Sequence, residues 1–316
     1  MADIMFIKTS SLGDVIHHMP ALTEAQRRRP DARFAWVVEE AFAPIVRLHP
    51  AVSEVIPVAW RRWRKSPWRP ASLREIATSF ADLRAHRDDR VVIDTQGLLR
   101  SAMTARAAHG LRHGYDRKSI REPLASLFYD LRHTVSRDLH AVERNRLLTG
   151  LSLGYTPEGP ADFGLDRDRL RAGGERTAVL LHATARPEKE WAEANWIALA
   201  RSIGARGLRP VLPCGTDDEH ARARRIAASV PNARVPERQT LDAVARLIAS
   251  AEIVVGVDTG LLHLAAALGV PLVAIFSGSR PHLTAPVGSG PMRVLGEFGK
   301  APSAEEVERA VAAIAG

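Results

Sequence analysis

The chain of 316 residues contains one cysteine, Cys214, so no disulfide can form within it. A single cysteine also excludes a structural zinc site made of several cysteines, and it is typical of proteins from a reducing compartment. The histidines are scattered without an H-E-x-x-H pair, and the D-x-D sequence at 166–168 fits a charged turn better than a metal ligand pair. We therefore expect no metal site.

Several signatures of enzymes are missing as well, namely the G-x-G-x-x-G fingerprint, the Walker A loop and the G-x-S-x-G elbow. Long uninterrupted apolar runs are also missing. The most apolar stretch, 253–276, contains Asp258, His263 and Pro271, which predicts a strand, a helix and a strand of a buried core rather than a membrane span. Residues 1–6 lack the basic start of a signal peptide, so we expect a soluble protein.

The composition is globular, with 46% hydrophobic and 25% charged residues, and the length suits two domains. The charge is unevenly placed. Residues 1–150 hold 25 Lys or Arg against 17 Asp or Glu, whereas residues 151–316 hold 19 of each. The first half therefore predicts an anionic partner such as nucleic acid, anionic lipid or a phosphorylated substrate.

Short apolar runs alternate with segments of helical spacing in both halves. Such runs predict strands buried on both faces, and the alternation predicts an α/β fold with parallel sheets covered by helices. The expected strands are 4–7, 34–38, 55–58 and 91–94 in the first half, and 178–181, 210–213, 253–257, 270–276 and 292–295 in the second. The first expected helix spans 11–29.

A stretch rich in Gly, Pro and charge separates the two halves. We expect a first domain at 1–155, a linker at 156–174, a second domain at 175–302, and a terminal amphipathic helix at 303–316 with the first domain as a possible packing partner. Ligands bind at the carboxyl ends of parallel strands, so we expect the site in a cleft between the domains, among residues that follow strands.

Segment 8–14, KTSSLGD, directly follows the first expected strand. Its small hydroxyl residues Ser10 and Ser11 and its Gly13 allow a ligand to approach the backbone at a helix start. Asp14 has two interpretations: it caps the helix, or it serves as a general base.

Segment 257–263, VDTGLLH, lies between a buried strand and an apolar helix. Thr259 and Gly260 offer backbone N–H groups to a phosphate. Asp258 and His263 are either ligand contacts, or a cap and a satisfied core histidine.

Three further segments carry polar chemistry. After another expected strand, Thr184 and Lys189 are placed to contact a diphosphate, although a charged surface loop is the alternative. Glu219 follows the next strand and suits either a ribose or a helix cap. The run 60–69, WRRWRKSPWR, predicts contact with an anionic lipid or with nucleic acid, because arginines grip anions and tryptophans favour interfaces.

Taken in order, these motifs resemble the heptosyltransferases of lipopolysaccharide core synthesis, heptosyltransferase I above all. The matching segments are 8–14, 20–22, 56–58, 61–65, 96–98, 121–126, 140–144 and 258–263. The resemblance implies a GT-B fold of two Rossmann-like, doubly wound domains with the active site in the cleft between them. It also implies a metal-independent, inverting transfer of L-glycero-D-manno-heptose from ADP-heptose to a Kdo sugar of Kdo2-lipid A.

The same resemblance assigns roles to individual residues. The catalytic pair would be Asp14, as general base, and Lys189. The donor-binding residues would be Ser10, Ser11, Gly13, Thr184, Lys189, Glu219, Asp258, Thr259, Gly260 and His263; the acceptor-binding residues would be Arg61, Arg62, Arg64, Lys65, Arg121 and Arg144. No cofactor besides the donor substrate is implied, and the protein would sit peripherally on the cytoplasmic face of the inner membrane.

Two positions depart from the family pattern. Ala185 replaces a usual hydroxyl residue, and Ala192 replaces a usual proline. Two other functions stay open at this point: a sister enzyme of the heptosyltransferase II type that adds heptose to heptose, and a non-catalytic binder of an anionic polymer such as RNA.

Overall fold

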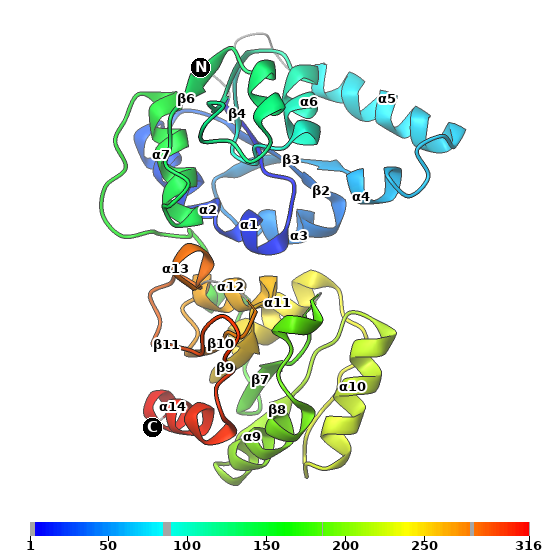
Figure 1. Cartoon of the computed structure of the whole chain (residues 1–316), viewed down its shortest axis with the longest axis vertical. Coiled ribbons are helices and arrows are strands. Elements are labelled where there is room, and N and C mark those ends of the chain that lie inside the picture. Colours follow the sequence, from blue (N-terminus) through cyan, green and yellow to red (C-terminus); the bar gives the residue numbers. More distant parts are fainter. Residues whose placement is uncertain (1–3, 85–89, 185, 279–280, 316) are drawn as a thin grey trace. The chain divides into compact units, whose positions relative to one another are not determined.

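The computed structural model describes residues 4–84, 90–184, 186–278 and 281–315. The chain divides into two compact units, Met1–Gly164 and Leu165–Gly316. The boundary falls inside segment 156–174, where the sequence indicates a linker. Figure 1 labels the helices and strands of both units.

The first unit contains six strands. These are β1 (Ile4–Ile7), β2 (Phe34–Glu39), β3 (Val52–Val58), β4 (Val91–Asp94), β5 (Leu111–Tyr115) and β6 (Leu131–His133). Its helices are α1 (Leu12–Ile16), α2 (Met19–Arg28), η1 (Glu40–Phe42), α3 (Ala43–Val46), α4 (Trp60–Trp63), α5 (Pro70–Arg84), α6 (Leu99–Ala107), η2 (Pro123–Phe128) and α7 (Ala141–Leu153).

The strand order of this sheet is β3-β2-β1-β4-β5-β6, and every described pairing is parallel. The chain runs outward from β1 through β2 to β3, and then returns to pair β4 on the other side of β1. In sheets of this kind, ligands bind at the carboxyl ends of the two strands where the order reverses, which here are β1 and β4. The residues after Ile7 and after Asp94 follow these strand ends.

The second unit contains five strands, β7 (Thr177–Leu181), β8 (Arg209–Val211), β9 (Ile253–Val257), β10 (Leu272–Ile275) and β11 (Met292–Leu295). Its helices are α8 (Arg167–Leu170), η3 (Pro187–Lys189), α9 (Glu193–Ala205), α10 (Asp217–Ala228), α11 (Leu241–Ser250), α12 (Gly260–Ala267), α13 (Pro281–Thr284) and α14 (Ala304–Ala315). The strand order β11-β10-β9-β7-β8 reverses between β7 and β9, so the corresponding switch point lies at their carboxyl ends.

Buried strands explain the apolar runs of the sequence. All residues of β1 and β9 are buried, because helices cover both faces of a parallel sheet. The largest fully buried side chains are Trp36 and Phe6 in the first unit and Trp191 and Trp196 in the second. The expected α/β class with two parallel sheets is confirmed.

One expectation differs from the structure. The predicted helix over 11–29 is divided into α1 and α2, and Pro20 lies in the first turn of α2, where its missing N–H costs no hydrogen bond. The terminal helix α14 packs within the second unit, against α9 and β9–β11. Val307 and Val311 of α14 belong to the hydrophobic core of that unit.

Acid should destabilise the first unit through His49, which is 2% exposed. Its Nδ1 accepts a hydrogen bond from the Ala51 N–H (3.2 Å), and its Nε2 lies 2.8 Å from Thr23 Oγ1, so the neutral ring satisfies both contacts. Burial lowers the pKa of His49 to about 4. The unfolded chain therefore takes up the proton at higher pH, and stability falls as the pH drops from about 6.5 towards 4.

The expected loss from His49 is on the order of 3 kcal/mol over that interval. Urea unfolding at pH 7, 5.5 and 4.5 measures it. His49→Gln, which cannot be protonated, should show a flatter pH dependence. An identical slope in this variant would contradict the role of His49.

Candidate active site

The loop after β1 is fixed by a side chain that follows β4. Gln96 Oε1 accepts hydrogen bonds from the backbone N–H groups of Thr9 (3.1 Å) and Ser10 (3.2 Å). Arg100 of α6 donates to Ser10 Oγ at 2.9 Å. These contacts join the loop after β1 to the loop after β4 and to α6.

Asp94 in turn shapes the turn that carries Gln96. This fully buried carboxylate accepts hydrogen bonds from the N–H groups of Gln96 (2.8 Å) and Gly97 (3.2 Å) and from the Tyr129 hydroxyl (2.7 Å). Burial raises the pKa of Asp94, and the hydrogen bonds oppose that shift. Gly97 has a φ of +68°, a conformation that favours glycine. No local motif indicates this role of Asp94, because its partner Tyr129 is 35 residues away in the chain.

Asp14 lies in the first turn of α1, beside this loop. Its Oδ2 accepts hydrogen bonds from both the N–H (2.7 Å) and the Oγ (3.0 Å) of Ser11. Both bonds use the same oxygen, and no described protein group donates to the other, Oδ1. Asp14 is thus a helix cap and also has an oxygen available to accept a proton. Gly13 is a buried residue of α1.

Lys8 lies beneath the same loop and is 6% exposed. Its Nζ donates to Thr95 O (2.8 Å) and Asn145 Oδ1 (3.4 Å). Burial lowers the pKa of Lys8, while the negative charges of Asp14 and Asp94 act in the opposite direction. The buried Lys8 side chain therefore places a positive charge near the Asp14 carboxylate.

The basic residues expected at an acceptor differ in their surroundings. Arg62 is held by Glu40 through two hydrogen bonds of 3.2 Å and by Glu75 at 2.6 Å. The Trp63 Nε1 donates to the same Glu75 oxygen at 2.9 Å, so Arg62 ties α4 to η1 and α5. The structure thus gives Arg62 a role in anchoring α4.

The other acceptor candidates are less occupied by acids. The Arg61 guanidinium lies 4.7 Å from the centre of the Phe42 ring, and that of Arg144 lies 4.8 Å from the Tyr115 ring and donates to Ser119 O at 2.7 Å. The remaining candidates, Arg64, Lys65 and Arg121, are exposed, and no carboxylate pairs with them in the described part of the chain.

In the second unit, Lys189 and Asp258 form the centre of the site. Lys189 Nζ donates to Asp258 Oδ2 at 2.5 Å, although the two residues are 69 positions apart. Thr184 Oγ1 donates to the Asp258 carbonyl oxygen at 3.2 Å. The loops after β7 and after β9 therefore meet at the switch point of this sheet, with a polar group from each.

His263 lies one turn into α12 and approaches the same carboxylate, with its Nε2 3.7 Å from Asp258 Oδ1. Thr259 is the N-cap of α12 with an extended backbone and makes no side-chain cap hydrogen bond. The first N–H groups of the helix, including that of Gly260, point out of its N-terminus, where they suit an anion.

A pocket of about 740 Å³ shares Thr184 with this centre. It is lined by Ala183, Thr184, Glu190, Trp191, Ala192, Glu193, Thr216, Asp218, Glu219, Arg222 and Arg225. Glu219 Oε2 accepts from the Gly215 N–H at 2.7 Å, and Thr216 Oγ1 accepts from the Glu219 N–H at 3.2 Å. Glu219 thus caps α10 and also lines the pocket. Ala185 lies outside the described residues.

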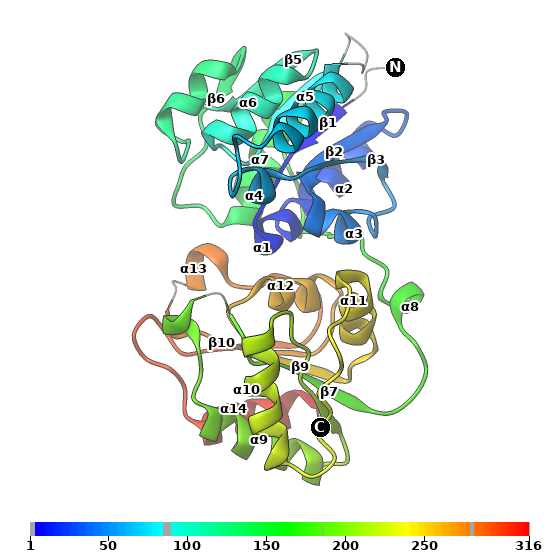
Figure 2. The ribbon, with the colours of Figure 1, turned by 90° about the vertical axis from the view of Figure 1, so that its right-hand side faces the viewer.

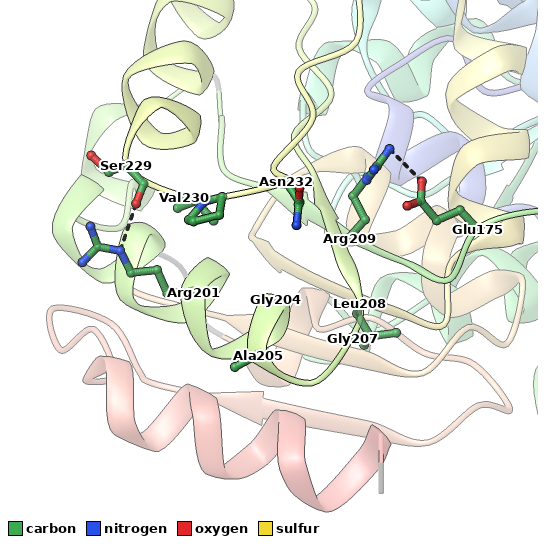
Figure 3. Close-up of a pocket in the computed structure, with 11 residues that line it drawn as sticks. Glu175, Arg201, Gly204, Ala205, Gly207, Leu208, Arg209, Ser229, Val230 and Asn232 are labelled. Atoms are coloured by element: carbon green, nitrogen blue, oxygen red, sulfur yellow. Dashed lines mark hydrogen bonds and ion pairs between the residues drawn. The ribbon is translucent and has the colours of Figure 1, made fainter.

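A second pocket of this unit, about 620 Å³, lies near Arg209, the first residue of β8 (Figure 3). Arg209 pairs with Glu175 at 2.9 Å, and Arg201 donates to Ser229 O at 2.9 Å. This pocket is at the amino end of its strand, whereas the site residues follow strand ends, so it is not part of the candidate site.

No helix within the described ranges is long and apolar enough to cross a membrane. No group of three or more His, Cys, Asp or Glu side chains in those ranges could hold a metal ion.

Comparison with known proteins identifies the class. The family glycosyltransferase family 9 (heptosyltransferase) matches residues 78–313. The fold is that of the E. coli heptosyltransferase WaaC, whose structure with ADP has a TM-score of 0.91 and 40% identity and covers 98% of this chain and 99% of that chain. The chain therefore belongs to glycosyltransferase family 9, the heptosyltransferases, and has the GT-B fold.

Within the family, the similarity to heptosyltransferase 1 covers nearly the whole chain. Lipopolysaccharide heptosyltransferase 1 of Salmonella typhimurium is 45% identical over 294 residues, 92% of each chain. Lipopolysaccharide heptosyltransferase 2 of E. coli is 32% identical over 107 residues, 32% of this chain. The resemblance to heptosyltransferase I of lipopolysaccharide core synthesis, expected from the motifs, is confirmed. The alternative of a non-catalytic polymer binder is not supported.

Removal of the Gln96 amide should loosen the loop after β1. Gln96→Ala leaves two backbone N–H groups without their acceptor, at an expected cost of about 1–3 kcal/mol in the free energy of unfolding. Hydrogen exchange of the Thr9 and Ser10 amides should accelerate. Gln96→Glu keeps an oxygen acceptor and should preserve their protection; equal exchange in all three proteins would rule out this role.

Proposed function

We propose that this protein transfers L-glycero-D-manno-heptose from ADP-heptose to a Kdo sugar of Kdo2-lipid A, with inversion at the anomeric carbon. The observation that carries the proposal is the similarity to heptosyltransferase 1 over 92% of both chains. The stretch shared with heptosyltransferase 2 is much shorter, which favours a Kdo acceptor over a heptose acceptor.

The donor would bind at the switch point of the second sheet. The leaving group is a diphosphate, so negative charge develops there as the glycosidic bond breaks. The Lys189 ammonium, with three donors, can reach an anion while keeping its bond to Asp258. The N–H groups at the start of α12, around Thr259 and Gly260, add positive potential.

The rest of the donor would be held by neighbouring polar groups. Thr184 would contact the diphosphate, and Glu219 the ribose at the pocket of 740 Å³. Asp258 and His263 would lie near the heptose, with Ser10, Ser11 and Gly13 of the first unit as further contacts. In support, the E. coli protein of this fold also has a structure with ADP-2-deoxy-2-fluoro heptose, at a TM-score of 0.90 and 39% identity.

The acceptor hydroxyl would lose its proton to Asp14. In an inverting transfer the acceptor oxygen attacks the anomeric carbon from the face opposite the leaving group. The new C–O bond forms as the bond to the β-phosphate oxygen breaks, the electron pair leaves with ADP, and the proton goes to Asp14 Oδ1. The Kdo carboxylate would pair with the exposed guanidinium and ammonium groups of Arg61, Arg64, Lys65 and Arg121 and with the partly buried guanidinium of Arg144.

The direct test of the proposal is ADP release from ADP-heptose with and without Kdo2-lipid A, in the presence and absence of EDTA. We expect acceptor-dependent release that persists in EDTA, because Lys189 and the α12 N-terminus supply the positive charge. Release only with an already heptosylated acceptor would instead assign the sister activity. No release with either acceptor would refute the proposal.

Asp14→Asn tests the general base. The asparagine side chain still accepts the hydrogen bonds of Ser11, so the fold should persist, but it cannot take the proton. We expect kcat to fall by about a hundredfold or more, with the affinity for ADP unchanged. Turnover near that of the unmodified protein would remove Asp14 from this role.

Lys189→Ala tests the leaving-group site. Loss of the ammonium should weaken ADP binding by about tenfold or more, as measured by calorimetry, since charge-assisted bonds to a phosphate are strong. Lys300→Ala, an exposed lysine of the same unit, is the matched control and should bind ADP normally. Equal affinities in the two variants would contradict the assignment.

A further inference from the structure

Exposed hydrophobic side chains are concentrated in the first unit. In the described ranges, twelve large hydrophobic residues are more than a third exposed, and ten of them belong to this unit. Six of the ten lie on the segment from α4 to α5, on α6 and on η2: Trp68, Leu73, Leu99, Met103, Leu124 and Leu127. A cluster of exposed apolar side chains indicates a surface that contacts a membrane or another protein.

The elements that carry these side chains are neighbours. Helix α6 packs against α5 and against η2, and α5 and α6 lie side by side in both views of the fold (Figures 1 and 2). The Leu99 N–H donates to Glu122 Oε2 at 2.6 Å, which ties the start of α6 to the start of η2.

The exposed apolar side chains of each element lie on one face of that element. Leu99 and Met103 are four positions apart on α6, and Leu124 and Leu127 are three apart on the 3-10 turn η2, so each pair shares a face. We call these four residues the α6–η2 surface. Leu124 and Leu127 are 65% and 67% exposed, so little in this chain covers them.

Basic residues dominate the same elements. Segments 60–84, 99–107 and 117–128 hold 12 Lys or Arg against 3 Asp or Glu. One of the three acids, Glu75, is already paired with Arg62. The charge around the α6–η2 surface therefore complements an anionic partner.

We propose that the α6–η2 surface docks the protein on an anionic lipid bilayer. Aliphatic side chains partition into the boundary between headgroups and acyl chains, while flanking arginines and lysines meet the lipid phosphates. RNA is less well matched, because leucine and methionine offer no flat face for base stacking. This docking refines the proposed function, since a lipid-borne acceptor is reached at a bilayer surface, but it is measured without any acceptor.

Sedimentation with vesicles of phosphatidylglycerol and phosphatidylethanolamine, free of any Kdo lipid, tests the docking. The unmodified protein should bind, and binding should weaken with salt. The double variant Leu124→Ser/Leu127→Ser should lower the partition coefficient about tenfold or more, because both side chains lose apolar area to bury. Phe298→Ser, at a residue 70% exposed in the second unit, is the matched control and should bind as the unmodified protein does.

Three results would overturn the docking: no vesicle binding by the unmodified protein, equal loss in the Phe298 variant, or no loss in the leucine variant. Salt-sensitive binding to RNA without vesicle binding would instead assign the α6–η2 surface to nucleic-acid binding. Failure of the proposed function gives a different pattern. In that case ADP release stays absent even with a deacylated, water-soluble Kdo acceptor. If the proposed function holds, the leucine variant should release ADP normally with this soluble acceptor.

Discussion

The reversal of strand order in each sheet is the constraint on which the candidate site depends. Parallel pairing brings the carboxyl ends of all strands to one edge, and the strand order reverses at β1/β4 and at β7/β9. The loops that follow these four strands carry nearly all the polar contacts described for the site. Backbone groups in such loops are free of the sheet's hydrogen bonds, so side chains such as Gln96 and Asp94 must hold them in place.

In the second unit, the same edge brings together an ion pair that is mostly removed from water. The side chains of Lys189 and Asp258 are 15% and 9% exposed. Removing such a pair from water costs free energy, which is offset only when the geometry of the pair is good and neighbouring polar groups bond to it. The 2.5 Å contact and the polar groups around it fulfil this condition. The pair also keeps the ammonium oriented before a ligand arrives, which limits the entropy lost on binding.

The basic excess of the first unit has more than one structural use. Arg62 is engaged by two glutamates, Arg144 lies over a tyrosine ring, and Arg64 is exposed. The sequence alone does not distinguish these three arginines, because each simply adds one positive charge to the first half of the chain. Their chemistry differs because neighbours from other elements, such as Glu40 of η1 and Glu75 of α5, reach only some of them.

The sequence by itself determined the class of fold, the approximate division of the chain and the family, because apolar runs, linker composition and ordered motifs are local properties. The tertiary structure alone decided which polar groups meet. The bonds of Thr9 to Gln96 and of Lys189 to Asp258 join positions 87 and 69 residues apart, and strand order, not local spacing, brings them together. The same holds for α14: its apolar stripe is visible in the sequence, but only the packed core of the second unit fixes where that stripe is buried.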